Sequence, residues 1–306
     1  MLKVYLFSKN FVYLIKKLMG IFWIIPVTFL WAVTNIVIKK LQNHSLSSEY
    51  ILFVSGFISA IILLISNYFM NGIDFGSILT YSYIGAIGYF SYVLLINSFR
   101  YINIGLAVLI SNLSIIFANI LNYLFLAEFL SFDKQIILIA IFALFGLYAY
   151  FHYQDDNKDI LKGLFLAFSS SILAGVWYFA VNYNMSVSGI SGFELKSYAI
   201  VGGLLVLFLY IIFYKGFDYI KQNTNTINLK RSLILVLFLL AFIEVFSDSA
   251  FFSMYNYHAG ALLNVLALFE IAFSFLLGFL IFKEKNLKID YVIFSLIFVL
   301  LVLFMI

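Results

Sequence analysis

Three acidic residues stand inside long apolar stretches of the sequence, where charged side chains are otherwise rare. Glu244 and Asp248 are four positions apart, which places both carboxylates on one face of a helix. Glu270 lies in the next apolar stretch, and we expect no lysine, arginine or histidine to pair with any of the three in mid-stretch. Acids inside a membrane usually face an interior cavity, and desolvation favours their protonated form. All three are therefore proton-coupling candidates; the alternative is neutral acids that are hydrogen-bonded across a helix interface.

Amide and hydroxyl side chains collect in two apolar stretches, each on a limited arc of a helix. Such groups can replace the hydration shell of a polar substrate, so they are predicted to line a substrate pathway. The alternative is hydrogen bonding between helices, which is worth about 0.6 kcal/mol per bond in membrane proteins. The residues are Ser111, Asn112, Ser114 and Asn119 in the stretch 104–127, and Asn264, Glu270 and Ser274 in the stretch 259–282.

The composition indicates the environment in which these groups act. The chain has 306 residues, of which 65% are hydrophobic and only 10% are charged. Soluble domains carry roughly a quarter charged residues, so this chain is predicted to lie in a lipid bilayer. It contains no cysteine, which excludes disulfide scaffolds, cysteine-ligated zinc and thiol catalysis. The net charge of +4 is small and dispersed, so no nucleic-acid partner is expected.

Ten apolar stretches are long enough to cross a bilayer as helices, which takes about 20 mostly apolar residues each. They are apolar on every side, whereas strands of a membrane barrel alternate polar and apolar residues over about ten positions. The sequence therefore predicts an all-α membrane protein with ten transmembrane helices and short connections, the longest loop being Lys215 to Arg231. The predicted spans are 19–39, 49–70, 78–99, 104–127, 135–152, 161–183, 193–214, 232–254, 259–282 and 288–306.

The segment 1–18 has a different pattern, in which lysines are interleaved with aromatic and leucine residues. No small-residue cleavage site follows it, so a basic amphipathic leader helix at the membrane interface is favoured over a signal peptide. Twelve of the eighteen basic residues fall on the side opposite the N-terminus, which favours an external N-terminus. The basic leader favours the reverse. Of the two, we favour a cytoplasmic N-terminus.

The chain contains an internal repeat. A shift of 156 residues aligns the third and fourth stretches with the eighth and ninth without a gap, and places Tyr101 on Tyr257 and Glu128 on Glu284. The organisation is then five spans, 19–152, followed by five more, 160–306. Because five is odd, the second copy must enter the membrane from the opposite side. The sequence therefore predicts two inverted five-helix repeats with a cavity at their interface.

The segments GLAVLISNLSIIFANILNYLFLAEFLS and GALLNVLALFEIAFSFLLGFLIFKEKNL resemble the signature segments of the drug/metabolite transporter superfamily, in its EamA-type tandem-repeat branch. In that family each copy has a small-residue helix, usually with a proline, and a glutamate where the helix ends. Those glutamates correspond here to Glu128 and Glu284, and Glu270 stands where the second copy has a further glutamate. The sequence departs from the pattern at the proline positions, which hold Ile115 and Ile271.

The resemblance implies roles for further residues. The first and sixth spans face the central cavity in that family, which adds Trp31, Asn35, Trp177 and Tyr178 to the predicted pathway; the alternative is ordinary packing. Two more residues, Glu128 and Glu284, are assigned a gating or structural role, in which each pairs with a basic loop residue or a helix N-terminus across the repeat axis. The alternative is that both are plain interfacial charges.

The predicted function is that of a secondary transporter. It exports or exchanges a small polar metabolite, such as an amino acid, across the cytoplasmic (inner) membrane by alternating access, with proton coupling through the buried acids. A membrane-embedded transferase is disfavoured, because the three histidines are scattered and no phosphate-binding glycine loop occurs. A channel and a flippase for a lipid-linked substrate remain as alternatives. No cofactor or metal is expected, and the protein is expected to be a monomer or weak homodimer.

Overall fold

Every regular element in the described part of the chain is helical. The computed structural model describes residues 22–44, 46–152, 158–229, 232–255, 258–282 and 288–305. The predicted leader 1–18 and Glu284 lie outside these residues. The helices are α2 Ile24–Gln42, α3 Ser48–Asn71, α4 Phe75–Ser98, α5 Ile104–Ser111, α6 Ser114–Leu126, α7 Phe132–His152, α8 Lys158–Ser188, α9 Gly192–Tyr210, η1 Ile211–Lys215, α10 Phe217–Leu229, α11 Ser232–Met254, α12 Gly260–Leu266, α13 Phe269–Phe282 and α14 Lys288–Met305.

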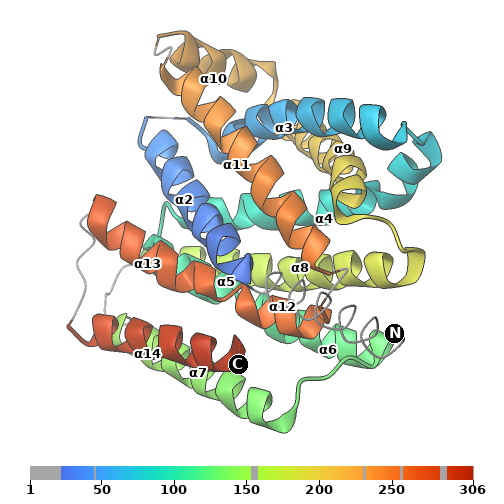
Figure 1. The fold of residues 1–306 in the computed structure, drawn as a ribbon. Coiled ribbons are helices and arrows are strands. Elements are labelled where there is room, and N and C mark those ends of the chain that lie inside the picture. The colour runs from blue at the N-terminus through green and yellow to red at the C-terminus, as the bar shows by residue number, and fades with distance from the viewer. Residues whose placement is uncertain are drawn as a thin grey trace, which may run out of the picture.

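The all-helical membrane architecture is confirmed, and the chain is an integral multi-pass membrane protein. Eight helical segments of the described chain are long and apolar enough to cross a bilayer, counting α5–α6 and α12–α13 as one segment each. The two further spans expected from the sequence correspond to α7 and α14, which pack against each other at one edge of the bundle (Figure 1). The predicted loop Lys215 to Arg231 was wrong in part, because Phe217–Leu229 forms the helix α10.

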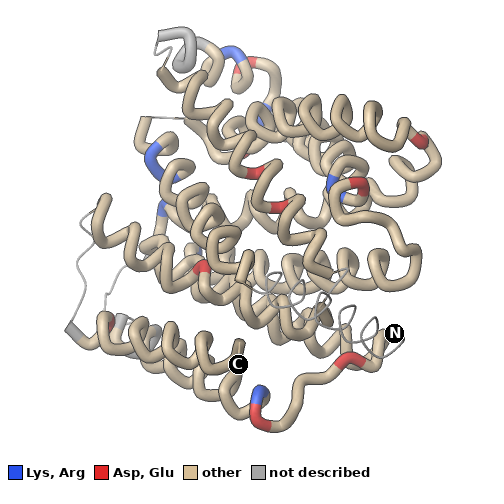
Figure 2. Tube along the Cα trace, in the orientation of Figure 1, with Lys and Arg blue, Asp and Glu red and all other residues tan. Residues whose placement is uncertain are grey.

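The surface of the bundle suits lipid rather than water. Many large apolar side chains are exposed on it, and Phe69 and Phe213 are each 81% exposed. In water such a surface would drive association, whereas in hydrocarbon it needs no partner. Figure 2 shows that charged residues gather at the ends of the helices and that few lie along their middles. Those few mark the interior of the bundle.

Two of the membrane segments are broken at equivalent places. The first changes from α5 to α6 at Asn112 and Leu113, and the second from α12 to α13 at Ala267 and Leu268. Both breaks close with tighter i→i−3 bonds, such as Ile115 N–H to the Asn112 carbonyl at 3.1 Å. At the first break the Asn112 side chain donates to the Val108 carbonyl at 2.8 Å, which competes with the helical ladder. The helices therefore break without the proline of the resembling family.

The contacts between helices can be compared with the repeat predicted from the sequence. Helix α4 of the first half packs on α8 and α9 of the second half. In the same way, α11 of the second half packs on α2 and α3 of the first half. Likewise α6 packs on α8, and α13 packs on α2. Two pairs join elements that hold the same place in the order of the two halves, α3 with α9 and α7 with α14. The contact of α5 with α13 corresponds to that of α12 with α6 when the two halves of the chain are interchanged.

The crossing of α4 and α9 depends on glycine. A Cβ added at Gly85 would stand 1.6 Å from the Ala199 carbonyl oxygen, and one at Gly202 would stand 1.9 Å from the Ser82 carbonyl oxygen. Without these side chains the two backbones touch, which is a common way for membrane helices to pack closely. Because both helices contribute to the central cavity, this contact sets how its walls face each other.

We expect Gly85→Ala to destabilise the protein, because the added methyl group meets backbone that cannot rotate away. Overpacking of this kind costs about 1–3 kcal/mol or more. The measurement is the midpoint of thermal unfolding in detergent. Gly146→Ala in α7 is the matched control, since a Cβ there meets nothing within 4 Å. Equal midpoints for the two variants would contradict the close crossing.

Candidate functional site

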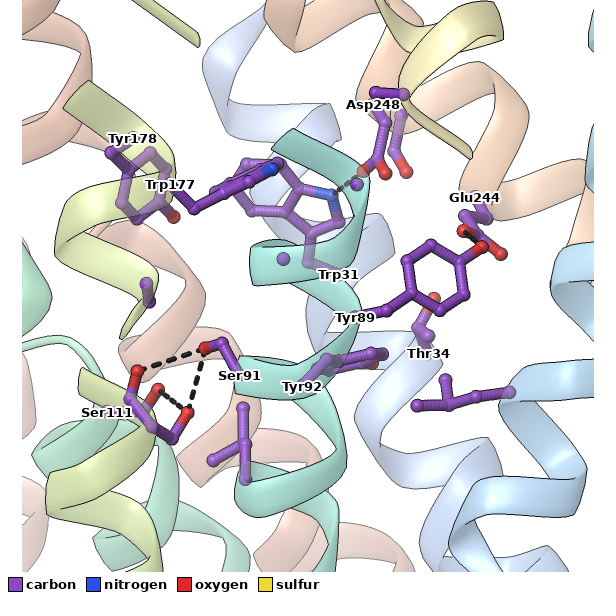
Figure 3. Close-up of a pocket in the computed structure, with 18 of the residues that line it drawn as sticks. Trp31, Thr34, Tyr89, Ser91, Tyr92, Ser111, Trp177, Tyr178, Glu244 and Asp248 are labelled. Atoms are coloured by element: carbon purple, nitrogen blue, oxygen red, sulfur yellow. Dashed lines mark hydrogen bonds between the residues drawn. The ribbon is translucent and has the colours of Figure 1, made fainter. Parts of the chain in front are cut away.

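A cavity of about 170 Å³ lies at the centre of the bundle. Its walls come from α2, α3, α4, α5, α6, α8, α9, α11 and α13, so both halves of the chain contribute. Figure 3 shows aromatic rings and carboxylates on one side of this space and a group of serines on the other. The volume suits a small molecule. Three carboxyl groups, Glu244, Asp248 and Glu270, and one ammonium, Lys196, line it.

An ion cluster joins α9 to α11 at the cavity wall. The Lys196 ammonium lies 2.5 Å from Asp248 Oδ2 and 3.5 Å from Glu244 Oε1. The Trp31 indole N–H donates to Asp248 Oδ1 at 2.8 Å, and the Tyr89 hydroxyl donates to Glu244 Oε1 at 2.8 Å, as Figure 3 illustrates. The two acids are indeed one turn apart on one helix face. Each carboxylate thereby has a counter-charge and at least one neutral donor.

The expectation that no basic residue pairs with these acids was wrong. Lys196 was counted with the loop residues because it stands only three positions inside the predicted span 193–214. The helix α9 begins at Gly192, and the Lys196 side chain is buried in the cavity wall instead of reaching the interface. Lys196 therefore adds nothing to the interfacial charge on the N-terminal side. It compensates one of the two acids of α11.

Glu270 has a different environment from the other two acids. It stands in the first turn of α13, directly after the helix break, and it lines the cavity. The Asn35 amide donates to Glu270 Oε1 at 2.7 Å, and the Tyr92 hydroxyl donates to Asn35 Oδ1 at 3.1 Å. Among the described residues no lysine, arginine or histidine is within ion-pair distance of Glu270. This carboxyl is therefore held by neutral groups alone.

Aromatic rings form much of the remaining wall. Trp31, Tyr89, Tyr92, Trp177 and Tyr178 all line the cavity. The rings of Trp177 and Tyr178 lie 4.9 Å apart, and a Cβ at Gly88 would stand 2.7 Å from Trp177 Nε1. The glycine therefore leaves the space that the indole occupies. Faces of such rings attract cations as well as apolar groups.

Hydroxyl groups line the opposite side of the cavity. The Ser91 hydroxyl donates to the Ser170 carbonyl at 3.0 Å, and the hydroxyls of Ser111 and Ser170 are 3.3 Å apart (Figure 3). Asn112 and Ser114 line the cavity beside them, at the break between α5 and α6. The predicted polar arc is thus split by the break, and its first three members face the cavity.

Other predicted residues lie away from this cavity. Asn119 and Asn264 face each other from the two broken segments, with Asn264 Nδ2 3.4 Å from Asn119 Oδ1, and neither lines the cavity. Ser274 is buried outside it. Glu128 accepts from the Asn182 amide at 3.0 Å and from the Ala261 backbone N–H at 3.3 Å, which links the end of α6 to the start of α12.

The sequence reasoning missed several residues of the site. Lys196 is the most important, and its signal was a charge inside a predicted span. Tyr89, Tyr92, Ser91 and Ser170 carried no signal, because tyrosine and serine are frequent throughout the chain. Among the described residues, no group of three or more histidine, aspartate or glutamate side chains is placed to hold a metal ion.

Comparison with known proteins identifies the fold. Residues 18–151 match the model of the EamA-like transporter family, which confirms the resemblance seen in the sequence. A solved structure described only as the crystal structure of a protein shares the fold, with a TM-score of 0.63 and 12% identity. The match covers 95% of this chain and 96% of the other, and at this identity it establishes the fold alone. No curated protein matches the sequence.

We expect Lys196→Met to lower the midpoint of thermal unfolding in detergent. The substitution leaves Glu244 and Asp248 buried without their counter-charge, and breaking a buried pair in this way costs about 3–5 kcal/mol. The double variant Lys196→Met with Asp248→Asn removes one negative charge as well and should recover part of the loss. Lys221→Met changes an exposed lysine of α10 and serves as the control. If the unfolding midpoint of Lys196→Met equals that of the wild type, the ammonium does not compensate these acids.

Proposed function

We propose that this chain, whose residues 18–151 belong to the EamA-like transporter family, is a secondary transporter of small polar metabolites. The family makes a membrane transporter the coarse function and argues against a membrane-embedded transferase. The finer proposal is export or exchange of a metabolite such as an amino acid across the cytoplasmic membrane by alternating access. The observation that carries it is a central cavity, built by both halves of the chain, in which Glu244, Asp248 and Glu270 meet.

We further propose that ten spans form two inverted five-helix repeats, 19–152 and 160–306. Two features support this organisation. The α-helix is interrupted at Asn112 and at Ala267, positions that the 156-residue shift brings to within one residue of each other. The helix contacts are also exchanged when the halves are interchanged. Inverted repeats of this kind place the substrate site at the midplane, where broken helices supply polar groups.

The proposed pathway runs along the walls of the cavity. Residues of the broken segment α5–α6 face it from one half, and Glu270 faces it from the other. The Glu128 carboxylate, bound to Asn182 and to the Ala261 amide, is proposed as a contact that opens and closes one end. Since one chain encloses the whole cavity, a monomer is the proposed functional unit. Nothing in the cavity favours a lipid-linked phosphate, because its one described basic residue is already paired.

Proton coupling is proposed for Glu270. Glu244 and Asp248 share the Lys196 ammonium, which supplies one positive charge between them. Glu270 has only the Asn35 amide, and a carboxyl in an apolar bundle without a counter-charge binds a proton more readily. Asp248, Tyr92 and Tyr178 line the same cavity and supply no positive charge, and Lys196 is bound to the other two acids.

Purified protein in liposomes is expected to give saturable flux that is accelerated by unlabelled substrate on the far side. This counterflow is diagnostic of a carrier, because a carrier returns faster when loaded. The measurement is uptake of labelled amino acids, amines and nucleosides by vesicles loaded with the same compounds. Flux that stays linear with concentration and shows no exchange would indicate a channel instead.

Glu270→Gln is expected to abolish the pH dependence of transport. Glutamine keeps the hydrogen bond to Asn35, but its side chain neither gains nor loses a proton as the pH changes. The measurement is the initial rate of uptake as the pH is varied equally on both sides. Asp218→Asn, an exposed acid of α10, is the control and should retain the wild-type profile. Undiminished pH dependence in Glu270→Gln would exclude a coupling role for this residue.

A further inference from the structure

We propose that the cavity takes a small organic amine, a singly charged cation with an apolar or aromatic body, and that the Lys196 ammonium holds the amine's place when the cavity is empty. This inference rests on the proposed transport function and narrows its substrate class. It favours an amine without a carboxylate over an amino acid. Three features of the cavity carry it: its charge, its aromatic walls and the position of Lys196.

The charge of the cavity is unbalanced. Its described lining contains three carboxyl groups, Glu244, Asp248 and Glu270, and one ammonium, Lys196. Uncompensated negative charge in an apolar bundle is costly, so the empty site favours the uptake of a cation. A substrate carboxylate would find the opposite situation. The single basic group is already bound to two acids, and no arginine lines the cavity in the described part of the chain.

The aromatic walls suit the rest of such a molecule. The Trp31 indole is fixed beside the acids because its N–H donates to Asp248 at 2.8 Å. Trp177 and Tyr178 stand against the same space. Ring faces attract an ammonium group by about 0.5–2 kcal/mol, and they also bury an apolar body. A zwitterion gains the first of these contacts and loses hydration at its carboxylate without compensation.

The position of Lys196 explains how the empty site is kept stable. Its ammonium lies between Glu244 and Asp248, where an ammonium of the substrate would be bound. An incoming amine therefore competes with a tethered one, and the acids keep one counter-charge in both states. Glu270 in its deprotonated form supplies the additional negative charge that lets the loaded site hold a second cation. Binding and release then replace one ammonium group by another. The difference in free energy between the empty and the loaded site therefore stays small.

The first test compares four probes that share one ring and differ only at the head group. They are tyramine, a cation; tyrosine, a zwitterion; tyrosol, which is neutral; and 4-hydroxyphenylacetate, an anion. The readout is the midpoint of thermal unfolding of the purified wild-type protein in detergent. Tyramine at saturating concentration is expected to raise it by about 2 °C or more, and the other three by less. Absence of a shift with tyramine, or an equal shift with tyrosine, would overturn the inference.

The second test concerns the charge of Glu270. Glu270→Gln is expected to weaken tyramine binding about tenfold, because it removes the negative charge that lets the loaded site hold a second cation. Asp218→Asn removes one acid of the same chain outside the cavity and should bind like the wild type. Wild-type affinity in Glu270→Gln would overturn this role of Glu270.

The third test concerns Lys196. In Lys196→Met the acids lack their tethered ammonium, so tyramine should raise the unfolding midpoint more than it does in the wild type. Lys196→Arg keeps the charge, and a guanidinium binds carboxylates bidentately and is harder to displace. Tyramine should therefore bind more weakly to Lys196→Arg, which decides the question if the methionine variant does not fold. Equal affinity of tyramine for the wild type and for Lys196→Arg would overturn the proposed competition between tyramine and the Lys196 ammonium.

Failure of this inference is distinguishable from failure of the transport function. Counterflow of tyrosine without counterflow of tyramine would leave the carrier proposal intact and exclude the amine preference. Stabilisation by tyramine without any saturable flux would do the reverse: the site would bind amines in a protein that does not carry them. Saturable counterflow of tyramine that needs about tenfold more tyramine in Glu270→Gln would support both.

Discussion

One ammonium group between two carboxylates, inside an apolar bundle, is the interaction on which the rest of the structure depends. Lys196 brings α9 to Glu244 and Asp248 of α11. The same carboxylates bind the Trp31 indole of α2, the Tyr89 hydroxyl of α4 and, at 3.2 Å, the Ser59 hydroxyl of α3. Five helices from both halves are therefore fixed by a single cluster. Buried ion pairs contribute little net stability, but they specify which groups must face each other, because any other arrangement leaves a charge alone. The cluster thus defines the relative position of the helices and makes a polar cavity tolerable at the same time.

The broken helices follow from the same constraint. Backbone at membrane depth leaves the helical ladder only where it lines a cavity or is buried in protein. At Asn112 the break faces the cavity, and the Val108 carbonyl accepts both the Asn112 backbone N–H at 3.0 Å and the Asn112 side chain at 2.8 Å. At Ala267 and Leu268 the break is followed at once by Glu270, which therefore stands in the first turn of a new helix and is aimed at the cavity. Irregular backbone and buried charge occur together because each needs the same water-accessible space.

The sequence predicted the helical class, the positions of the membrane segments and the three acids, because these depend on composition and on helical spacing. It did not predict the partners of the acids. Asn35 and Glu270 are 235 positions apart, and no local pattern joins them. Lys196 was assigned to the interface because a lysine one turn inside a span usually extends its ammonium outward. Its inward direction is toward the two acids of α11, 48 and 52 residues further along the chain, and such a contact is a property of tertiary packing. The helix breaks were equally invisible, since the residues at the expected proline positions are isoleucines.

The proposed transport cycle requires the two ends of the bundle to open and close while its centre stays assembled. The interactions at the ends are weaker than those at the centre, as this cycle requires. At one end Glu128 binds Asn182 and a single backbone amide of α12. At the other end the Tyr219 hydroxyl of α10 donates to Glu49 at 2.8 Å, and Asn223 accepts from the Ser47 amide at 3.0 Å. Each is a hydrogen bond of the kind worth about 0.5–1.5 kcal/mol net, up to about 3 kcal/mol where a carboxylate accepts. Separating the ammonium from both carboxylates at the centre costs more than breaking either end. Motion is therefore cheapest where the contacts are few and water is near, and a cation that enters the centre can replace Lys196 without leaving the acids unpaired.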